Sequence, residues 1–433
     1  MFVMTTTIRV AIAVLLLASS LPLSAATINN DDSCDIAVLP AATLLLPYFE
    51  VDINAPQSVA KTTLFTVVNT SKSQAIARVT MWTDLAYPVL TFNLLLTGYD
   101  VQPVNLYDVL GRGTLPETNC LVQPPIPAAT LADIRTALTS GAISSCSGKV
   151  GFTHANAIGY LTIDLVAACG STSPVDPGYF NELLYDNVLT GDYQAINPNA
   201  ATGNYAGGTP LVHIRAIPEG GAAGAIVRTN LPYTFYDRYT PAGSADSRAR
   251  DRRQPLPALF TARLINGGSG SFNTELRFWR EGVVPPNAAC TDYATNGTVA
   301  MKVTDIVRFD EHENPNIPGI NTEAGPSRQP PVVLPAASSL PTSSAVFPPL
   351  SISGDVGGWF YLNLSNGGST NYSAKPDRTF NGSTVRPNQN WVAISMFAEG
   401  RYQTLFDATM LSNGCTAPPA TGQLIGPGPN PTP

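Results

Sequence analysis

Short runs in which apolar and polar residues alternate dominate the chain, and the clearest of them occur twice. The stretch from Thr62 to Asp84 reads TTLFTVVNTSKSQAIARVTMWTD, and the stretch from Leu259 to Glu281 reads LFTARLINGGSGSFNTELRFWRE. Each contains two runs rich in β-branched and aromatic residues with a period of two, which is typical of β-strands. The residues between the runs, NTSKSQ and NGGSGS, have turn composition. Both stretches are therefore predicted to be hairpins.

The resemblance extends along the chain. Asn69 and Asn266 open the two turns, and Trp82 and Trp279 end the two second strands. Three further blocks recur in the same order, namely 104–110 with 301–307, 159–165 with 358–364, and 211–220 with 391–400. A collinear set of matches indicates an internal duplication.

The duplication predicts an all-β fold of two tandem antiparallel β-sandwich units, immunoglobulin-like or jelly-roll-like, with a few short helices in loops. Unit 1 would span 27–228 and unit 2 would span 229–415, with a proline-rich insert at about 314–349. The tail, 416–433, is expected to be disordered. The strand pattern resembles that of bacterial surface immunoglobulin-like modules, without a motif that names a family.

The joint between the units allows two alignments. LPYTF at 231–235 matches LPYF at 46–49, a first strand, whereas TFYDRY at 234–239 matches TLFDATM at 404–410, a last strand. A strand shared or exchanged between the units would explain both matches. The next segment, SRARDRRQP at 247–255, is expected to be an exposed basic linker.

Two segments of unit 1 have helical periodicity. The segment 130–141, TLADIRTALTSG, has Thr130 in an N-cap position and a glycine at its end. The segment 179–191, YFNELLYDNVLTG, has apolar residues at helical spacing. Both are predicted to be helices that decorate the strand scaffold.

The amino-acid composition indicates where the protein is located. The 433 residues are 44% apolar and only 13% charged, with 38 prolines and 35 glycines. Polarity carried by Thr, Ser, Asn and Gly is typical of β-rich extracellular proteins. A net charge of −7 argues against a nucleic-acid partner, which requires a basic surface.

The N-terminus has the pattern of a secretion signal. Arg9 precedes the apolar run 10–18, and small residues at Ser24 and Ala26 favour cleavage after Ala26. Residues 1–26 are therefore predicted to be a signal peptide, with an uncleaved anchor as the alternative. No later run is long and apolar enough for a transmembrane anchor in the mature chain. The expected location is secreted, periplasmic or at the cell surface.

Six cysteines follow the predicted cleavage site, and an even number in an exported chain favours disulfides. The sequence leaves their connectivity open. The pairing preferred from position along the chain is Cys34–Cys120, Cys146–Cys169 and Cys290–Cys415.

No catalytic motif is present in the sequence. The three histidines, His154, His213 and His312, lie outside any HExxH pattern, and no G-x-S-x-G elbow occurs. Glu219 and Glu399 take matching places in the repeat and are the candidate acids of a glycan hydrolase. Retention in both copies is more simply explained by a structural role, such as an acid at a turn or a helix cap, so the enzyme hypothesis stays secondary.

Two further groups could bind ligands. Asp310, Glu311 and Glu313 lie together in FDEHENPN and could hold Ca²⁺, the only cofactor suggested, although the EF-hand spacing is lacking. Trp359 and Tyr361 in GGWFYLNL would share one face of a strand and could contact a glycan.

The sequence thus favours a secreted, non-enzymatic surface or envelope protein with a structural, adhesive or binding role. The alternative is a secreted glycan-binding or glycan-hydrolysing β-sandwich protein that uses acidic residues. The expected partners are a protein or glycan at the cell surface, or further copies of the chain, since exposed strand edges can accept another strand.

Overall fold

The computed structural model describes residues 36–116, 125–144, 148–176, 178–199, 203–216, 234–236, 251–268, 271–281, 301–302, 305–313, 315–316, 333–344, 347, 356–364, 389–398 and 402–412. These residues form antiparallel sheets joined by loops and short helical segments, so the predicted all-β, sandwich-type fold is confirmed. The predicted signal peptide, 1–26, and the tail, 416–433, lie outside them.

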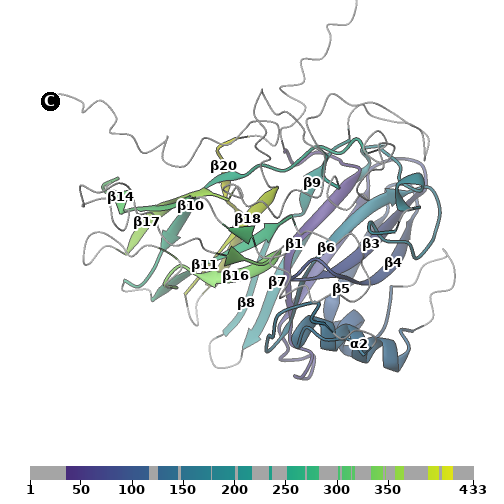
Figure 1. Ribbon diagram of the computed structural model, residues 1–433, viewed down its shortest axis with the longest axis horizontal. Helices are drawn as coiled ribbons and strands as arrows, with labels where there is room; N and C mark the ends of the chain where they lie inside the picture. Colours follow the sequence, from purple (N-terminus) through teal and green to yellow (C-terminus); the bar gives the residue numbers. More distant parts are fainter. Residues whose placement is uncertain are drawn as a thin grey trace, which may run out of the picture. The chain divides into compact units, whose positions relative to one another are not determined.

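The first half contributes a five-stranded sheet of order β4-β3-β6-β1-β9 and a four-stranded sheet of order β5-β2-β7-β8 (Figure 1). Apolar side chains from both sheets meet in one cluster, which includes Phe65, Val79 and Ile163. The strands are β1 (Thr43–Val51), β2 (Thr62–Asn69), β3 (Ala75–Thr83), β4 (Pro88–Leu96), β5 (Val101–Asn105), β6 (Ala157–Val166), β7 (Leu189–Asn199), β8 (Gly203–Pro210) and β9 (Val212–Ile214).

The second half contributes a five-stranded sheet of order β14-β13-β17-β10-β20, a four-stranded sheet of order β16-β11-β18-β19 and a short pair, β12-β15. Three of these strands fall within the predicted proline-rich insert, so part of that insert is sheet. The strands are β10 (Leu259–Ile265), β11 (Phe272–Arg280), β12 (Met301–Lys302), β13 (Asp305–Phe309), β14 (Pro315–Asn316), β15 (Val333–Leu334), β16 (Ala337–Pro341), β17 (Gly357–Asn363), β18 (Asn390–Ala398), β19 (Tyr402–Asp407) and β20 (Thr409–Met410).

The two opening repeats are not hairpins, and this prediction was wrong. Strand β2 pairs with β5 and β7, whereas β3 pairs with β4 and β6 in the other sheet. In the second copy, β10 pairs with β17 and β20, and β11 pairs with β16 and β18. Each repeat is therefore an arch that carries the chain from one sheet to the other. Alternation predicts strands but does not say which sheet each strand joins.

This first block has the same place in both halves, whereas two of the later blocks do not. Strand β6, which contains 159–165, pairs with β3, whereas its sequence match β17 pairs with β10 rather than with β11. Strand β9 pairs with β1, while its match β18 pairs with β11 and β19. The sequence matches of these two later blocks therefore do not mark equivalent strands.

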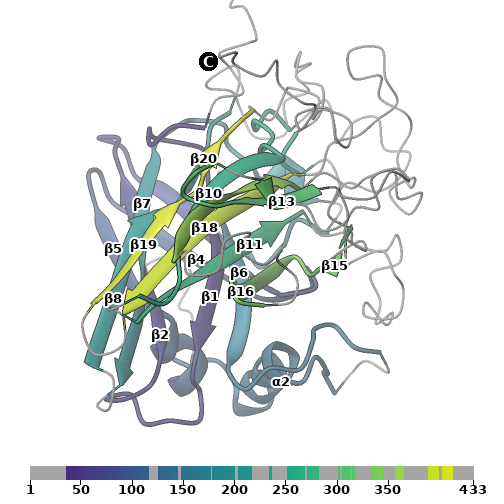
Figure 2. The ribbon, with the colours of Figure 1, turned by 90° about the vertical axis from the view of Figure 1, so that its left-hand side faces the viewer.

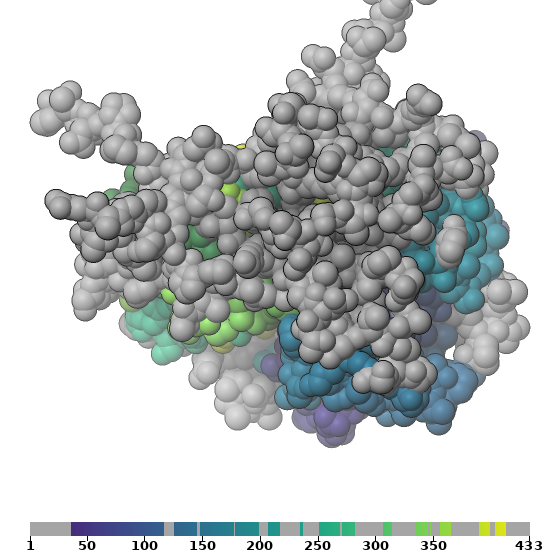
Figure 3. All heavy atoms as spheres, viewed as in Figure 1, coloured from purple at the N-terminus to yellow at the C-terminus, as the bar shows by residue number. Residues whose placement is uncertain are grey.

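One of the two predicted helices forms. Helix α2 spans Ala128–Thr139 and starts after Pro127 rather than at Thr130. It buries Leu131, Ile134 and Leu138 under the first sandwich, and its outer side is on the surface (Figure 3).

The helix predicted at 179–191 was wrong. Only a single 3₁₀ turn forms at Tyr179–Asn181, and the chain then runs extended into β7. The backbone of this segment bonds instead to the end of β6, with Ala167 donating to Glu182 and Leu184 donating to Leu165. Tertiary pairing therefore overrides the helical spacing of its apolar residues.

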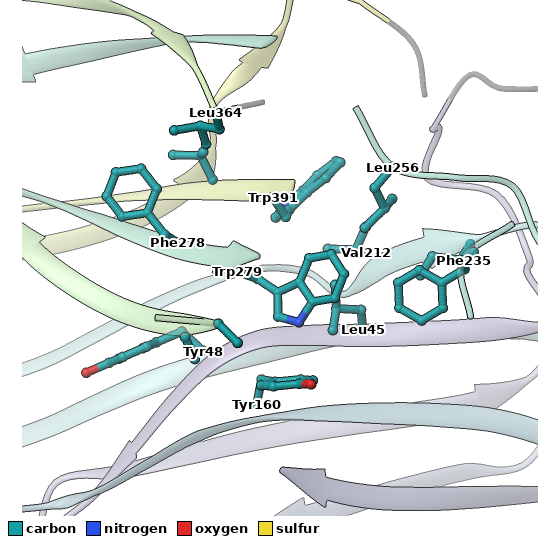
Figure 4. Packing of buried hydrophobic residues seen from close by; sticks show 14 of the residues in the cluster. Leu45, Tyr48, Tyr160, Val212, Phe235, Leu256, Phe278, Trp279, Leu364 and Trp391 are labelled. Atoms are coloured by element: carbon teal, nitrogen blue, oxygen red, sulfur yellow. The ribbon is translucent and has the colours of Figure 1, made fainter. Parts of the chain in front are cut away.

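A second apolar cluster is shared by both halves. The indole of Trp82 stacks on Tyr160 with ring centroids 5.7 Å apart, and Tyr160 meets Trp279 of the second half edge-on at 6.0 Å. Figure 4 shows Trp279 among side chains from both halves, including Leu45, Tyr160 and Trp391. Consistent with this shared core, contacts group Cys34–Pro433 into one compact unit.

The halves also meet along two strand edges. Strand β19 of the second half lies beside β8 of the first (Figure 2). Gly207 allows this approach, since a Cβ there would come within 2.9 Å of the Leu405 backbone nitrogen. No strand exchange is seen at 234–236, which is turn, and the predicted boundary near 228 lies outside the described residues.

Candidate functional site

The best candidate for a ligand site is the outer face of the β14-β13-β17-β10-β20 sheet. The other face of this sheet faces the shared core through Phe260, Phe360 and Leu362. On the outer face, the antiparallel register places Trp359 of β17 directly between Phe309 of β13 and Arg263 of β10. The three side chains therefore form a row across adjacent strands.

The two aromatic rings of this row are stacked. The ring centroids of Phe309 and Trp359 are 3.8 Å apart and their planes are within 7° of parallel. Both side chains are half-buried, whereas Tyr361 is only 7% exposed and packs with Leu259 and Val307. The predicted glycan-contact pair thus shares an apolar cluster, but Trp359 is the member that solvent reaches.

Glu311 joins this row from the turn that follows β13. Its carboxylate lies 3.3 Å from the Arg263 guanidinium, and both side chains are exposed. It also lies against Gly357, which precedes Trp359 by two residues. The structure therefore brings together two groups that the sequence assigned to separate ligands.

The calcium prediction gains no geometric support. The backbone N–H of His312 donates to Asp310 Oδ1 at 2.8 Å, and Asp310 is buried. Glu311 is engaged by Arg263, and Glu313 has a positive φ of 63° in the turn. Across the described residues, no group of three or more His, Cys, Asp or Glu side chains could hold a metal ion.

The histidines lie in separate places. His154 Nε2 is 2.7 Å from Asp84 Oδ2, and Asp84 also accepts the Phe152 backbone N–H at 3.1 Å. His213 bonds Thr190 at 2.8 Å, and burial lowers its pKa to about 4. His312 is exposed in the β13 turn. Asp84 thus fixes one loop, and His213 is a neutral core residue.

A buried polar centre around Asp164 is not predicted by any sequence pattern. Asp164 is fully buried and accepts hydrogen bonds from Thr43 at 2.6 Å, Tyr236 at 2.7 Å and Arg253 at 2.7 Å, as well as from Tyr179. No local pattern marks this centre, because its members come from distant parts of the chain. We call these residues, with Asp251, the Asp164 centre.

The predicted exposed linker supplies a key member of that centre, so this prediction was wrong for its last part. Residues 251–254 are buried, and Arg253 is 1% exposed. Arg253 Nε donates to Asp251 at 2.7 Å, and its guanidinium lies 4.1 Å from the centre of the Tyr236 ring. A buried arginine is stable here because two carboxylates and an aromatic face surround it.

Several predicted residues cannot be placed. Glu219 and Glu399 lie outside the described residues, as do five of the six cysteines. Cys169, the one cysteine within them, is disulfide-bonded, and its pairing with Cys146 stays a prediction. Asn69 and Asn363, which stand in N-x-S/T sequences, are fully buried and are not accessible for glycosylation.

No protein-family model, no curated protein and no solved structure matches this chain significantly. Among the described residues, no helix has the length and apolar character needed to cross a membrane.

Proposed function

We propose that this protein is a non-enzymatic, exported protein of the cell surface or envelope with a structural, adhesive or binding role. The predicted signal peptide and the disulfide at Cys169 support export, since disulfides persist in oxidising compartments. The low charge and high content of small polar residues support an extracellular setting.

The observation that carries the proposal is the continuous core between the halves. Trp82, Tyr160 and Trp279 pack across the joint, and Arg253 ties the segment before β10 to Asp164 in β6. Domains that move relative to one another usually meet through smaller and more polar interfaces. A rigid joint suits a protein that presents surfaces to partners.

Three buried or half-buried acids that could act in catalysis are instead engaged in structural hydrogen bonds. Asp164 is saturated with donors, Asp84 is bonded to His154 and to a backbone N–H, and Asp407 accepts from Trp391. These bonds favour a scaffold role for each acid.

The test combines location with activity. Cells that express the full chain are fractionated, and the N-terminus of the protein is determined by mass spectrometry. The proposal expects a chain that starts near residue 27, migrates differently under reducing conditions and leaves the cytoplasm. A chain with residues 1–26 intact in the cytoplasm would contradict export.

A second experiment tests whether the protein hydrolyses glycans. Purified protein is incubated with oligosaccharides and assayed for new reducing ends, next to a Glu219→Gln, Glu399→Gln double variant. No release by either protein is expected. Release by the wild type that the double variant loses would replace the proposal with glycan hydrolysis.

A further inference from the structure

The indole of Trp359 has one face free of its aromatic partner. Strands β13 and β10 flank β17 on opposite sides. Phe309 of β13 is stacked against one face of the indole at 3.8 Å. The other face is therefore directed towards the β10 side, where Arg263 stands in register with Trp359. A ligand that stacks on Trp359 would thus lie next to the Arg263 side chain.

Arg263 and Glu311 offer a donor and an acceptor at that place. One guanidinium nitrogen lies 3.4 and 3.3 Å from the two carboxylate oxygens. The side chains are 59% and 43% exposed, so the ion pair contributes little to stability and both groups can bond a ligand.

Glu311 can take its position only because residue 357 in the sheet beneath it is a glycine. A Cβ at Gly357 would lie 2.1 Å from Glu311 Oε1. Glycine within a strand weakens the strand and often marks a place where another group approaches the backbone closely. Here the missing side chain lets the carboxylate rest on the sheet beside the aromatic row.

We propose that this row, made of Phe309, Trp359, Arg263, Glu311 and Gly357, binds a neutral glycan. The apolar C–H face of a hexopyranose ring would stack on the free face of Trp359. Its hydroxyl groups, which both donate and accept, would bond the guanidinium and the carboxylate.

Charge selects a neutral ligand over an acidic one. The charges of Arg263 and Glu311 cancel across 3.3 Å, and the whole chain carries a net charge of −7. An acidic sugar would gain little from the paired arginine and would be repelled by Glu311 and by the chain as a whole. An extended peptide would bind an unpaired strand edge, whereas this row lies across the face of paired strands.

Tryptophan fluorescence gives a direct readout. The chain has four tryptophans. Trp82, Trp279 and Trp391 are at most 4% exposed, whereas Trp359 is half-buried. Quenching by acrylamide should therefore report mainly on Trp359, and bound sugar should protect it.

The experiment titrates the full-length protein with a β-1,4-linked glucose hexamer and, separately, with a β-1,4-linked mannuronate hexamer. Binding is followed by calorimetry and by acrylamide quenching. Saturable binding of the glucose hexamer with protection of Trp359 is expected, together with weaker binding of the acidic hexamer. Absence of binding to both hexamers, or tighter binding of the acidic one, would overturn the proposal.

Variants locate the site. Trp359→Ala should weaken binding at least about tenfold, and Arg263→Ala should weaken it several-fold. Tyr99→Ala removes an aromatic ring that is 70% exposed elsewhere and should change nothing. Arg112→Ala is the matched control for Arg263, since Arg112 is also exposed and paired with an acid at 3.0 Å. Equal affinity of the wild type and both site variants would overturn the assignment.

Gly357→Ala separates a binding role from a packing role. The added Cβ must displace Glu311, whereas the aromatic stack is left in place. We expect weaker binding with an unchanged urea midpoint. This binding test is independent of the proposed export. If the protein bound no glycan, it could still be an exported scaffold protein.

Discussion

Asp407 is a carboxyl group held where the two halves meet. It lies in β19, accepts Trp391 Nε1 at 2.9 Å and accepts the Thr209 hydroxyl of β8 at 3.3 Å. Burial raises its pKa to about 6, and these two hydrogen bonds offset only part of that effect. Ionisation of this one side chain therefore opposes the contact between β8 and β19.

Asp407→Asn is expected to remove a fall in stability between pH 4 and 6. The folded state binds this proton more tightly than the unfolded state, so the stabilisation is full below about pH 4 and is lost as the pH rises through about 6. Between pH 4.5 and 7.5, the free energy of unfolding of the variant relative to wild type should rise by about 2 kcal/mol. Urea unfolding at both pH values measures this difference.

His213 gives the opposite dependence and serves as the comparison. Its lowered pKa of about 4 means that the unfolded state binds the proton more tightly. Its stabilisation is present above about pH 6.5 and is lost as the pH falls through about 4. His213→Gln should therefore flatten the acid side of the same profile. If both variants shifted the profile in the same direction, the assigned signs would be wrong.

The arch is the strand-level feature that both halves share, and its turn is organised by one asparagine. Asn69 Nδ2 donates to the carbonyls of Ser73 at 2.7 Å and Thr97 at 2.9 Å, and Oδ1 accepts from the Ser71 backbone at 3.0 Å. In the second copy, Asn266 Oδ1 accepts from Thr274 at 3.1 Å, and Nδ2 donates to the Thr342 hydroxyl. The occurrence of Asn at the same position in both copies is therefore explained by its hydrogen bonds within the turn.

Asn69→Ala should destabilise the protein by about 1–2 kcal/mol, because two carbonyls and one N–H of the turn lose their bonds to the buried Asn69 side chain. Asn69→Asp should be at least as harmful, since a carboxylate would face two carbonyl oxygens. The measurement is the urea midpoint, with Asn54→Ala, in an exposed turn, as the control. Equal midpoints for Asn69→Ala and wild type would contradict this role.

Local periodicity explains what could be predicted about the strands. The alternation in 62–69 and 272–280 specifies strands by itself, and helix α2 follows from its own spacing. Pairing depends on residues far away, which is why the arches read as hairpins and 179–191 read as a helix. At the candidate site, consecutive aromatics pointed to Trp359, but Phe309 and Gly357 became visible only through the register of three strands.

For the molecule as a whole, the joint was the least predictable part. Arg253 stands in a run of charges that is typical of a solvated linker, and its partner Asp164 is 89 residues away. Asp164 stands within an apolar strand, but no residue near Arg253 in the sequence predicts that Arg253 is buried. The Asp164 centre and the shared aromatic core arise from the meeting of both halves, so a pattern confined to one segment does not reveal them.

This joint predicts that residues 36–412 unfold in one cooperative transition, and Arg253→Met tests it. The substitution keeps apolar volume but leaves Asp164 and Asp251 buried without their cation, which should cost about 3–5 kcal/mol. Arg263→Met, at an exposed ion pair, should cost less than about 1 kcal/mol. Urea unfolding followed by tryptophan emission and by circular dichroism should give coincident curves for the wild type and both variants. Separate transitions in the wild type would show that the halves are independent, and equal midpoints for the two variants would show that Arg253 does not hold them together.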